Sequence, residues 1–147
     1  MSRVYTAPIE SVTISASGDI WQLATDSSTK ARILEWEITT DDTTAQALEY
    51  KLVFAATAGS GGTGMDETAL DQSNTVTSGC TALAANSTPA STLTDLQYFA
   101  HESLGPLGRI YDEKTAPMLD VSKAIVFILT TTPSSMELSG YVTWEEL

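Results

Sequence analysis

Apolar and polar residues alternate with period two along much of this chain, and the clearest case runs from Ala47 to Ala56. In that stretch Leu48, Tyr50, Leu52 and Phe54 occupy every second position. Successive side chains of a β-strand point to opposite faces, so the pattern predicts a strand with one buried face. Similar patterns predict strands over residues 4–7, 9–16, 20–25, 31–39, 107–111 and 136–147.

Residues 91–101 fit two descriptions. Leu93, Leu96 and Ala100 match a helical stripe, while Leu96, Tyr98 and Ala100 match a strand. We favour a strand because the segments on both sides are predicted strands.

The longest apolar run, Ala124 to Thr131, is rich in β-branched residues and is typical of a central strand covered on both faces. Thr132 to Ser135 is predicted to be a turn. The run is therefore expected to form an antiparallel hairpin with Met136 to Glu146. The side chains expected to be buried are those of Ile125, Phe127 and Leu129.

About eight to ten strands joined by short polar turns indicate an all-β protein, an antiparallel two-sheet sandwich. The 147 residues fit a single domain over residues 1–147, with an extended N-terminal arm over residues 1–8. Residues 57–90 are mostly Gly, Ser, Thr and other small residues, and predict one long flexible loop. Within it, the short segments Asn74–Thr77 and Cys80–Ala84 are candidates for pairing with another strand.

The side chains that could perform chemistry are few. Cys80 is the one cysteine, so the chain forms no internal disulfide, and we expect its side chain to be buried or half-buried and not a nucleophile. His101 is the one imidazole and is expected to be a partly buried polar residue. No nucleophile motif accompanies it, so we expect no enzyme and no cofactor. The acidic pairs at residues 41–42 and 66–67 do not follow the calcium-loop pattern, so no metal site is predicted.

Trp21, Trp36 and Trp144 all lie inside predicted strands. The first interpretation is that they pack in the core or on a sheet face. The alternative is that they form a platform on which sugar rings stack.

The formal net charge is −12, from 19 acidic and 7 basic residues. Such a charge repels phosphate backbones and anionic lipid, so neither nucleic acid nor a membrane is an expected partner. No apolar run approaches the ~20 residues of a membrane span, and the first residues lack a signal-peptide pattern. We expect a soluble protein made in a cytoplasm.

Two parts of the chain resemble a known family. The opening residues Arg3–Ala7, Val12–Ile14 and Asp19–Leu23, and the ending Met136–Leu147, are similar to small proteins encoded among the head genes of tailed bacteriophages and prophages. The resemblance implies a jelly-roll-like structural protein of the virion, a capsid decoration or cement protein on the capsid surface. Its partners would be the major capsid protein and further copies of itself, as a homo-oligomer and most simply a trimer.

The arm and the loop are the segments expected to order when the protein docks on a shell. The candidate partner-binding residues are accordingly Arg3, Val4, Tyr5, Gly59, Gly61, Gly62 and Gly64. Two other functions remain open: a carbohydrate-binding β-sandwich module, and a minor head-completion or tail structural protein.

Overall fold

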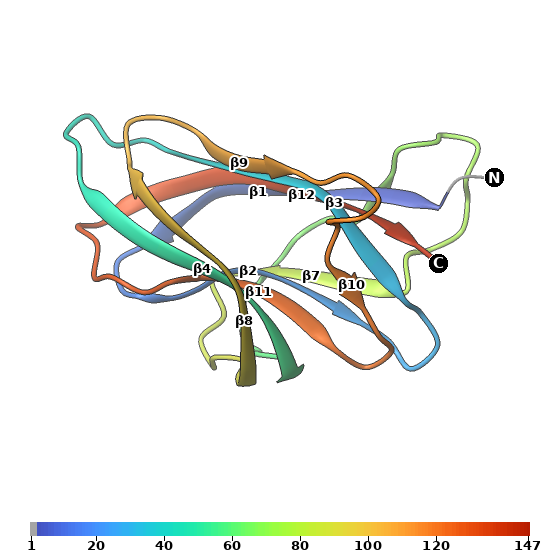
Figure 1. Ribbon diagram of the computed structural model, residues 1–147. Coiled ribbons are helices and arrows are strands. Elements are labelled where there is room, and N and C mark those ends of the chain that lie inside the picture. Colours follow the sequence, from blue (N-terminus) through green and yellow to red (C-terminus); the bar gives the residue numbers. More distant parts are fainter. Residues whose placement is uncertain (1–2) are drawn as a thin grey trace.

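The computed structural model describes residues 3–147 and contains strands and turns but no helix within that range (Figure 1). The expected all-β fold is confirmed. The strands are β1 (Val4–Ile14), β2 (Gly18–Thr25), β3 (Ala31–Thr40), β4 (Ala47–Thr57), β5 (Thr63–Gly64), β6 (Thr68–Ala69), β7 (Cys80–Ala84), β8 (Ser91–Glu102), β9 (Leu107–Ile110), β10 (Met118–Leu119), β11 (Ala124–Leu129) and β12 (Met136–Glu146).

These strands form two antiparallel sheets that lie one above the other in Figure 1. One sheet has the order β10-β3-β12-β1-β6, and β9 also pairs with β3. The other has the order β5-β7-β2-β11-β4-β8. Within these orders, β9, β3, β12 and β1 are four neighbouring strands of the first sheet, and β2, β11, β4 and β8 are four neighbouring strands of the second, with β7 and β5 beyond β2. This is the strand arrangement of a jelly roll, which confirms the predicted sandwich.

The core between the sheets is built around Phe127, which is fully buried in the middle of β11. Its ring centroid lies 4.4 Å from that of Trp36 and 4.9 Å from that of Tyr50, and Trp21 and Phe99 are each 5.9 Å away. Trp36 comes from the opposite sheet, so this aromatic cluster joins the two layers.

The predicted hairpin between residues 124–131 and 136–146 is wrong, because these strands lie in different sheets. β11 pairs with β2 and β4, whereas β12 pairs with β1 and β3. Residues 130–135 cross from one sheet to the other instead of turning back within one sheet. A turn sequence between two strands indicates where the chain changes direction, but it does not determine the sheet that the second strand joins.

The prediction that β11 is covered on both faces is confirmed. Ile125, Phe127 and Leu129 are buried in the main core, as expected. A second, smaller apolar cluster lies on the other face of the same sheet. Its buried members are Val53, Ala55, Ala90, Ala124 and Val126.

The N-terminal segment differs from the free arm expected over residues 1–8. Residues 1–2 lie outside the described range, and residues 4–8 belong to β1, which pairs with β12 along most of its length. Pro8 is accommodated inside this strand because β6 pairs only with Tyr5 and Thr6, which leaves one side of β1 without a neighbouring strand at Pro8.

The segment 57–90 is more ordered than the long loop that was expected, and of its two candidate pairing segments Cys80–Ala84 forms β7 whereas residues 74–77 form no strand. It contains β5 and β7, which pair with each other in one sheet, and β6, which pairs with β1 in the other. The segment therefore closes one side of the sandwich by contacting both sheets. The two ends of the segment also fold over the outer face of the second sheet. There the Gly59 N–H donates a hydrogen bond to Gln22 Oε1 at 2.8 Å, and the Ala90 N–H donates one to the Asp19 carboxylate at 3.0 Å.

Candidate docking surface on strand β8

Among the described residues β8 is the one long strand that ends a sheet. It has 12 residues and pairs only with β4. The other strands that end the sheets are β5, β6 and β10, each with 2 residues, together with the 4-residue β9, which is attached to one part of β3. Proteins commonly shorten or cover such edges because unpaired main-chain groups attract other strands. β8 is left long and open.

The main-chain groups that β8 leaves unpaired follow from its register with β4. Ser103 N–H donates to the carbonyl of Gln46 at 3.0 Å, and Ala47 lies opposite Glu102. Because bonded and non-bonded pairs alternate along an antiparallel ladder, the amides of alternate residues point away from β4. These outward groups include those of Tyr98 and Ala100, and we call this row of groups the β8 edge.

Apolar side chains surround the β8 edge. Leu93 and Leu96 are 39% and 38% exposed, and further along the strand Tyr98 is 70% exposed. On the neighbouring β10, Met118 is 56% exposed. Exposed apolar groups that gather beside an open strand are typical of an interaction surface.

A pocket of about 310 Å³ lies beside these residues, where β4 and β8 of one sheet face β10 of the other. β10 is too short to cover the first half of β8, so the sandwich remains open here. The pocket, which we call the mouth pocket, is mainly apolar inside and polar at its rim. It is lined by Phe54, Ala55, Ala56, Thr92, Thr94, Met118, Leu119, Asp120 and Lys123.

The backbone is strained at two points of this rim. Thr92 has a φ of 57°, and Ser122, in the turn between Asp120 and Lys123, has a φ of 53°. Positive φ is unfavourable for a non-glycine residue and especially for a β-branched one, and such residues cluster at functional sites. Among the described residues, two of the four non-glycine residues with positive φ thus lie in or next to the lining of the mouth pocket, and the other two are Ser11 and Ala85.

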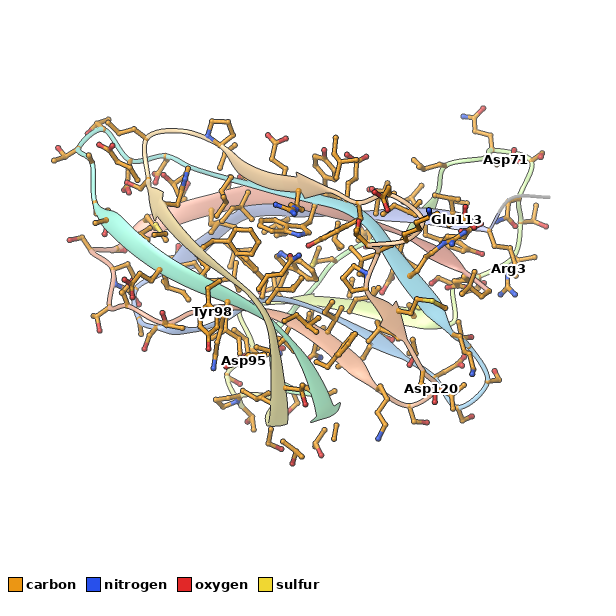
Figure 2. All side chains as sticks on the ribbon, viewed as in Figure 1. Arg3, Asp71, Asp95, Tyr98, Glu113 and Asp120 are labelled. Carbon is orange, nitrogen blue, oxygen red and sulfur yellow. The ribbon has the colours of Figure 1, made fainter. Side chains whose placement is uncertain are left out.

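A small polar cluster lies on the outward face of β8 and is visible in Figure 2. Asp95 accepts a hydrogen bond from the Tyr98 hydroxyl and forms an ion pair with Lys51 at 3.3 Å. The bond from Tyr98 is the main reason that the pKa of Asp95 is lowered, and Lys51 lowers it further. The same bond raises the pKa of Tyr98. Asp95 thus links Tyr98 of its own strand to Lys51 of β4.

The predicted candidates of the N-terminal arm lie far from β8, as the position of Arg3 in Figure 2 shows. Arg3 forms an ion pair with the buried carboxylate of Glu146 at 2.9 Å. Val4 is half-buried in β1. Tyr5 is 1% exposed, and its hydroxyl donates to the carbonyl of Val76 at 2.9 Å. Tyr5 is therefore a core residue and offers no surface to a partner.

The four candidate glycines are not brought together with the arm. A Cβ on Gly59 would lie 2.7 Å from the carbonyl oxygen of Thr88 and 2.8 Å from the nitrogen of Ala90, so close packing requires glycine there. Gly61 adopts a φ of 74°, which favours glycine for conformational reasons. Gly62 is half-buried, and Gly64 is exposed in β5. At Gly59 and Gly61 glycine is explained by packing and backbone geometry.

Trp21, Trp36 and Trp144 are 0%, 1% and 0% exposed, which confirms their assignment to the core. A sugar-stacking platform made of these three rings is wrong. Cys80 is 4% exposed, as expected, and burial raises the pKa of its thiol. His101 is half-buried at the end of β8, as predicted, with Nε2 2.7 Å from the carbonyl oxygen of Gly105.

Comparison with known proteins gives no relative for this chain: no family model, no curated protein and no solved structure matches it. Within residues 3–147 no helix is long and apolar enough to cross a membrane, and no group of three or more His, Cys, Asp or Glu side chains is arranged to hold a metal ion.

Proposed function

We propose that this protein is a structural component of a tailed phage particle and binds the outside of the capsid as a decoration or cement protein. The observation that carries the proposal is the combination of a jelly roll with one long open strand, β8, bordered by exposed apolar side chains. Jelly rolls are common among viral shell proteins. An assembled shell supplies the partner that such an edge otherwise lacks.

Two further observations support this proposal. The segments that resemble phage head proteins, at both ends of the sequence, form the strands β1, β2 and β12 of the sandwich. Docking through a strand edge also requires no catalytic group, which suits a chain with one His and one Cys. Repetition of the same contact over a symmetric shell adds avidity to an interface that is weak in a single copy.

The test is the abundance of the chain in purified phage particles from a bacterium that encodes it. Quantitative mass spectrometry of particles separated on a density gradient gives the number of copies per particle. A decoration protein is expected on the order of hundreds of copies, because it follows the symmetry of the shell. Copies in the tens or fewer would favour the head-completion or tail role, and absence from the particle would refute the proposal.

Assembly into a homo-oligomer, most simply a trimer, is part of the proposal. A charge of −12 on every subunit opposes association, and salt screens that repulsion. Oligomerisation of the free chain is therefore expected to strengthen as the salt concentration rises. Sedimentation equilibrium at low and high salt measures this, and a monomer at all salt concentrations would contradict the oligomer.

A carbohydrate-binding module is the second candidate, and it now depends on Tyr98 instead of the tryptophans. Tyr98 is 70% exposed beside a groove of about 500 Å³ that Glu49 and Lys51 also line. An exposed ring beside polar groups is the combination that sugar rings require. Binding on a glycan array that is lost in Tyr98→Ala would favour this candidate over the capsid role.

A further inference from the structure

We propose that the β8 edge accepts an extended, basic segment of another protein as an additional strand, and that an apolar side chain of that segment enters the mouth pocket. The inference deepens the proposed function, on which it rests for the identity of the partner as the shell protein. It specifies how the contact is made: main-chain hydrogen bonds to β8 supply affinity, and the pocket supplies specificity.

The exposed main chain of β8 favours strand addition. The outward N–H and C=O groups of Tyr98 and Ala100 form a regular row, and their natural complement is the main chain of another extended peptide. Between Ser91 and Glu102 the strand has no Pro, Lys or Arg, three residues that commonly block such pairing. Its irregularities, the positive φ of Thr92 and the bulge near Leu96, both precede Tyr98 and Ala100.

The mouth pocket lies where a side chain of the added strand can enter it. Thr92 and Thr94 of β8 line it on one side, and Met118 and Leu119 of β10 line it on the other. A strand added beyond β8 continues the same sheet, so every second side chain of that strand faces the opposite sheet, where β10 lies. One such side chain is placed at the opening of the pocket. Its volume of about 310 Å³ and its apolar lining suit a residue such as Leu, Met or Phe.

The charge of the chain favours a basic segment. β8 carries Asp95 and Glu102 and no Lys or Arg; Lys51 of β4 pairs with Asp95, and Lys123 lies at the mouth pocket. The whole chain nevertheless has a net charge of −12, so it repels an acidic segment, and a second copy would bring a further twelve negative charges. A basic segment is attracted, and the attraction also speeds its encounter with β8. Charge thus selects a basic partner strand over self-pairing.

The probe for this proposal is a short blocked peptide in which lysines alternate with valine and leucine. Two matched peptides serve as controls: one with N-methyl groups on the main-chain nitrogens that face β8, and one with glutamates in place of the lysines. Binding is measured by fluorescence anisotropy, and the amides that become protected are identified by hydrogen exchange with NMR. N-methylation is expected to weaken binding about tenfold or more, because it removes several main-chain hydrogen bonds.

Two variants locate the contact on the protein. Ala100→Pro removes an N–H that faces away from β4, so the pairing of β8 with β4 is retained while strand addition is blocked. Ala100→Thr keeps that N–H and is its matched control. Thr94→Phe fills the mouth pocket from its wall. Thermal unfolding shows that each variant is folded before binding is compared.

The expected result is slower exchange of the Tyr98 and Ala100 amides with the lysine peptide, loss of binding in Ala100→Pro, and retention in Ala100→Thr. Equal binding of the N-methylated peptide, or protection of amides away from β8, would overturn strand addition. Unchanged affinity in Thr94→Phe would overturn the role of the pocket.

Capsid binding separates this inference from the proposed function. If particles bind the natural chain and Ala100→Pro equally, the role of the β8 edge is refuted while the decoration function stands. If the lysine peptide binds as expected but the natural chain does not bind particles, the capsid function is refuted and the β8 edge remains a site for a different basic strand.

Discussion

Phe127→Ala is the substitution that tests the core most directly. The ring is fully buried and lies within 6 Å of four other aromatic rings, from both sheets. Loss of its apolar surface costs on the order of 2 kcal/mol. A residual cavity of roughly 60–100 Å³ adds about 1.5–2.4 kcal/mol at ~24 cal/mol per Å³. The expected loss in the free energy of unfolding is therefore about 3.5–4.5 kcal/mol.

Urea denaturation, followed by tryptophan fluorescence and circular dichroism, measures this loss. The dependence of the unfolding free energy on urea should stay unchanged, since the mutation alters packing and not the surface exposed on unfolding. Tyr98→Ala is the matched control, because its ring is 70% exposed and its removal should cost less than about 0.5 kcal/mol. A loss below about 1 kcal/mol for Phe127→Ala would show that the aromatic cluster is not the centre of the core.

Three further outcomes are expected. Gly140→Ala should destabilise the protein strongly or prevent folding, because a Cβ at this position would lie 1.9 Å from the carbonyl oxygen of Glu37. Denaturation midpoints measure the loss of stability, and an unchanged midpoint would contradict the register of β3 and β12. The Cys80 thiol should not react with a thiol reagent near pH 8 until urea unfolds the chain, because burial raises the pKa of the thiol. Reaction in the native state would show that the Cys80 side chain lies at the surface. Hydrogen bonds from the backbone of Ser28 and the side chain of Thr29 are the main causes that lower the pKa of Asp26 below 3.8 in the folded state. The contribution of Asp26 to stability is therefore present above that pH and is lost as the pH falls further. The free energy of unfolding should fall less steeply with acid in Asp26→Asn than in the natural chain, and identical acid-denaturation curves of the two proteins would show that Asp26 makes no contribution.

The sequence predicts individual strands well because strand burial depends on local alternation. Ala47–Ala56 and Met136–Leu147 match β4 and β12 almost to the residue. The pairing of strands depends instead on contacts between distant parts of the chain, and the period-two pattern contains no information about them. This is why β11 and β12 were assigned to one hairpin. Strands of two residues, such as β5 and β10, are too short to show any period.

The candidate site could be predicted only in part, for the same reason. Residues 91–101 fitted both a helix and a strand, and the strand, favoured because of the predicted strands on both sides, is confirmed as β8. Leu96, Tyr98 and Ala100, whose alternation matched a strand, are exposed. The order of strands in the two sheets determines that β8 ends its sheet. The same order determines that β10 leaves the mouth pocket open beside β8. The glycine-rich segment was favoured as a contact surface because of its composition. The backbone and packing constraints that explain Gly59 and Gly61 appear only in the folded structure.

The pairing of β1 with β12 has a consequence for synthesis of the chain. Val4 lies opposite Glu145, so β1 leaves the ribosome well before β12, the strand with which it pairs along most of its length. These two central strands therefore meet only after residues 136–146 have been translated. Until then β1 and β3 lack the strand that joins them, and unpaired strand edges of this kind promote aggregation of nascent chains. Translation that stops before residue 136 should release a chain that cannot form this sheet.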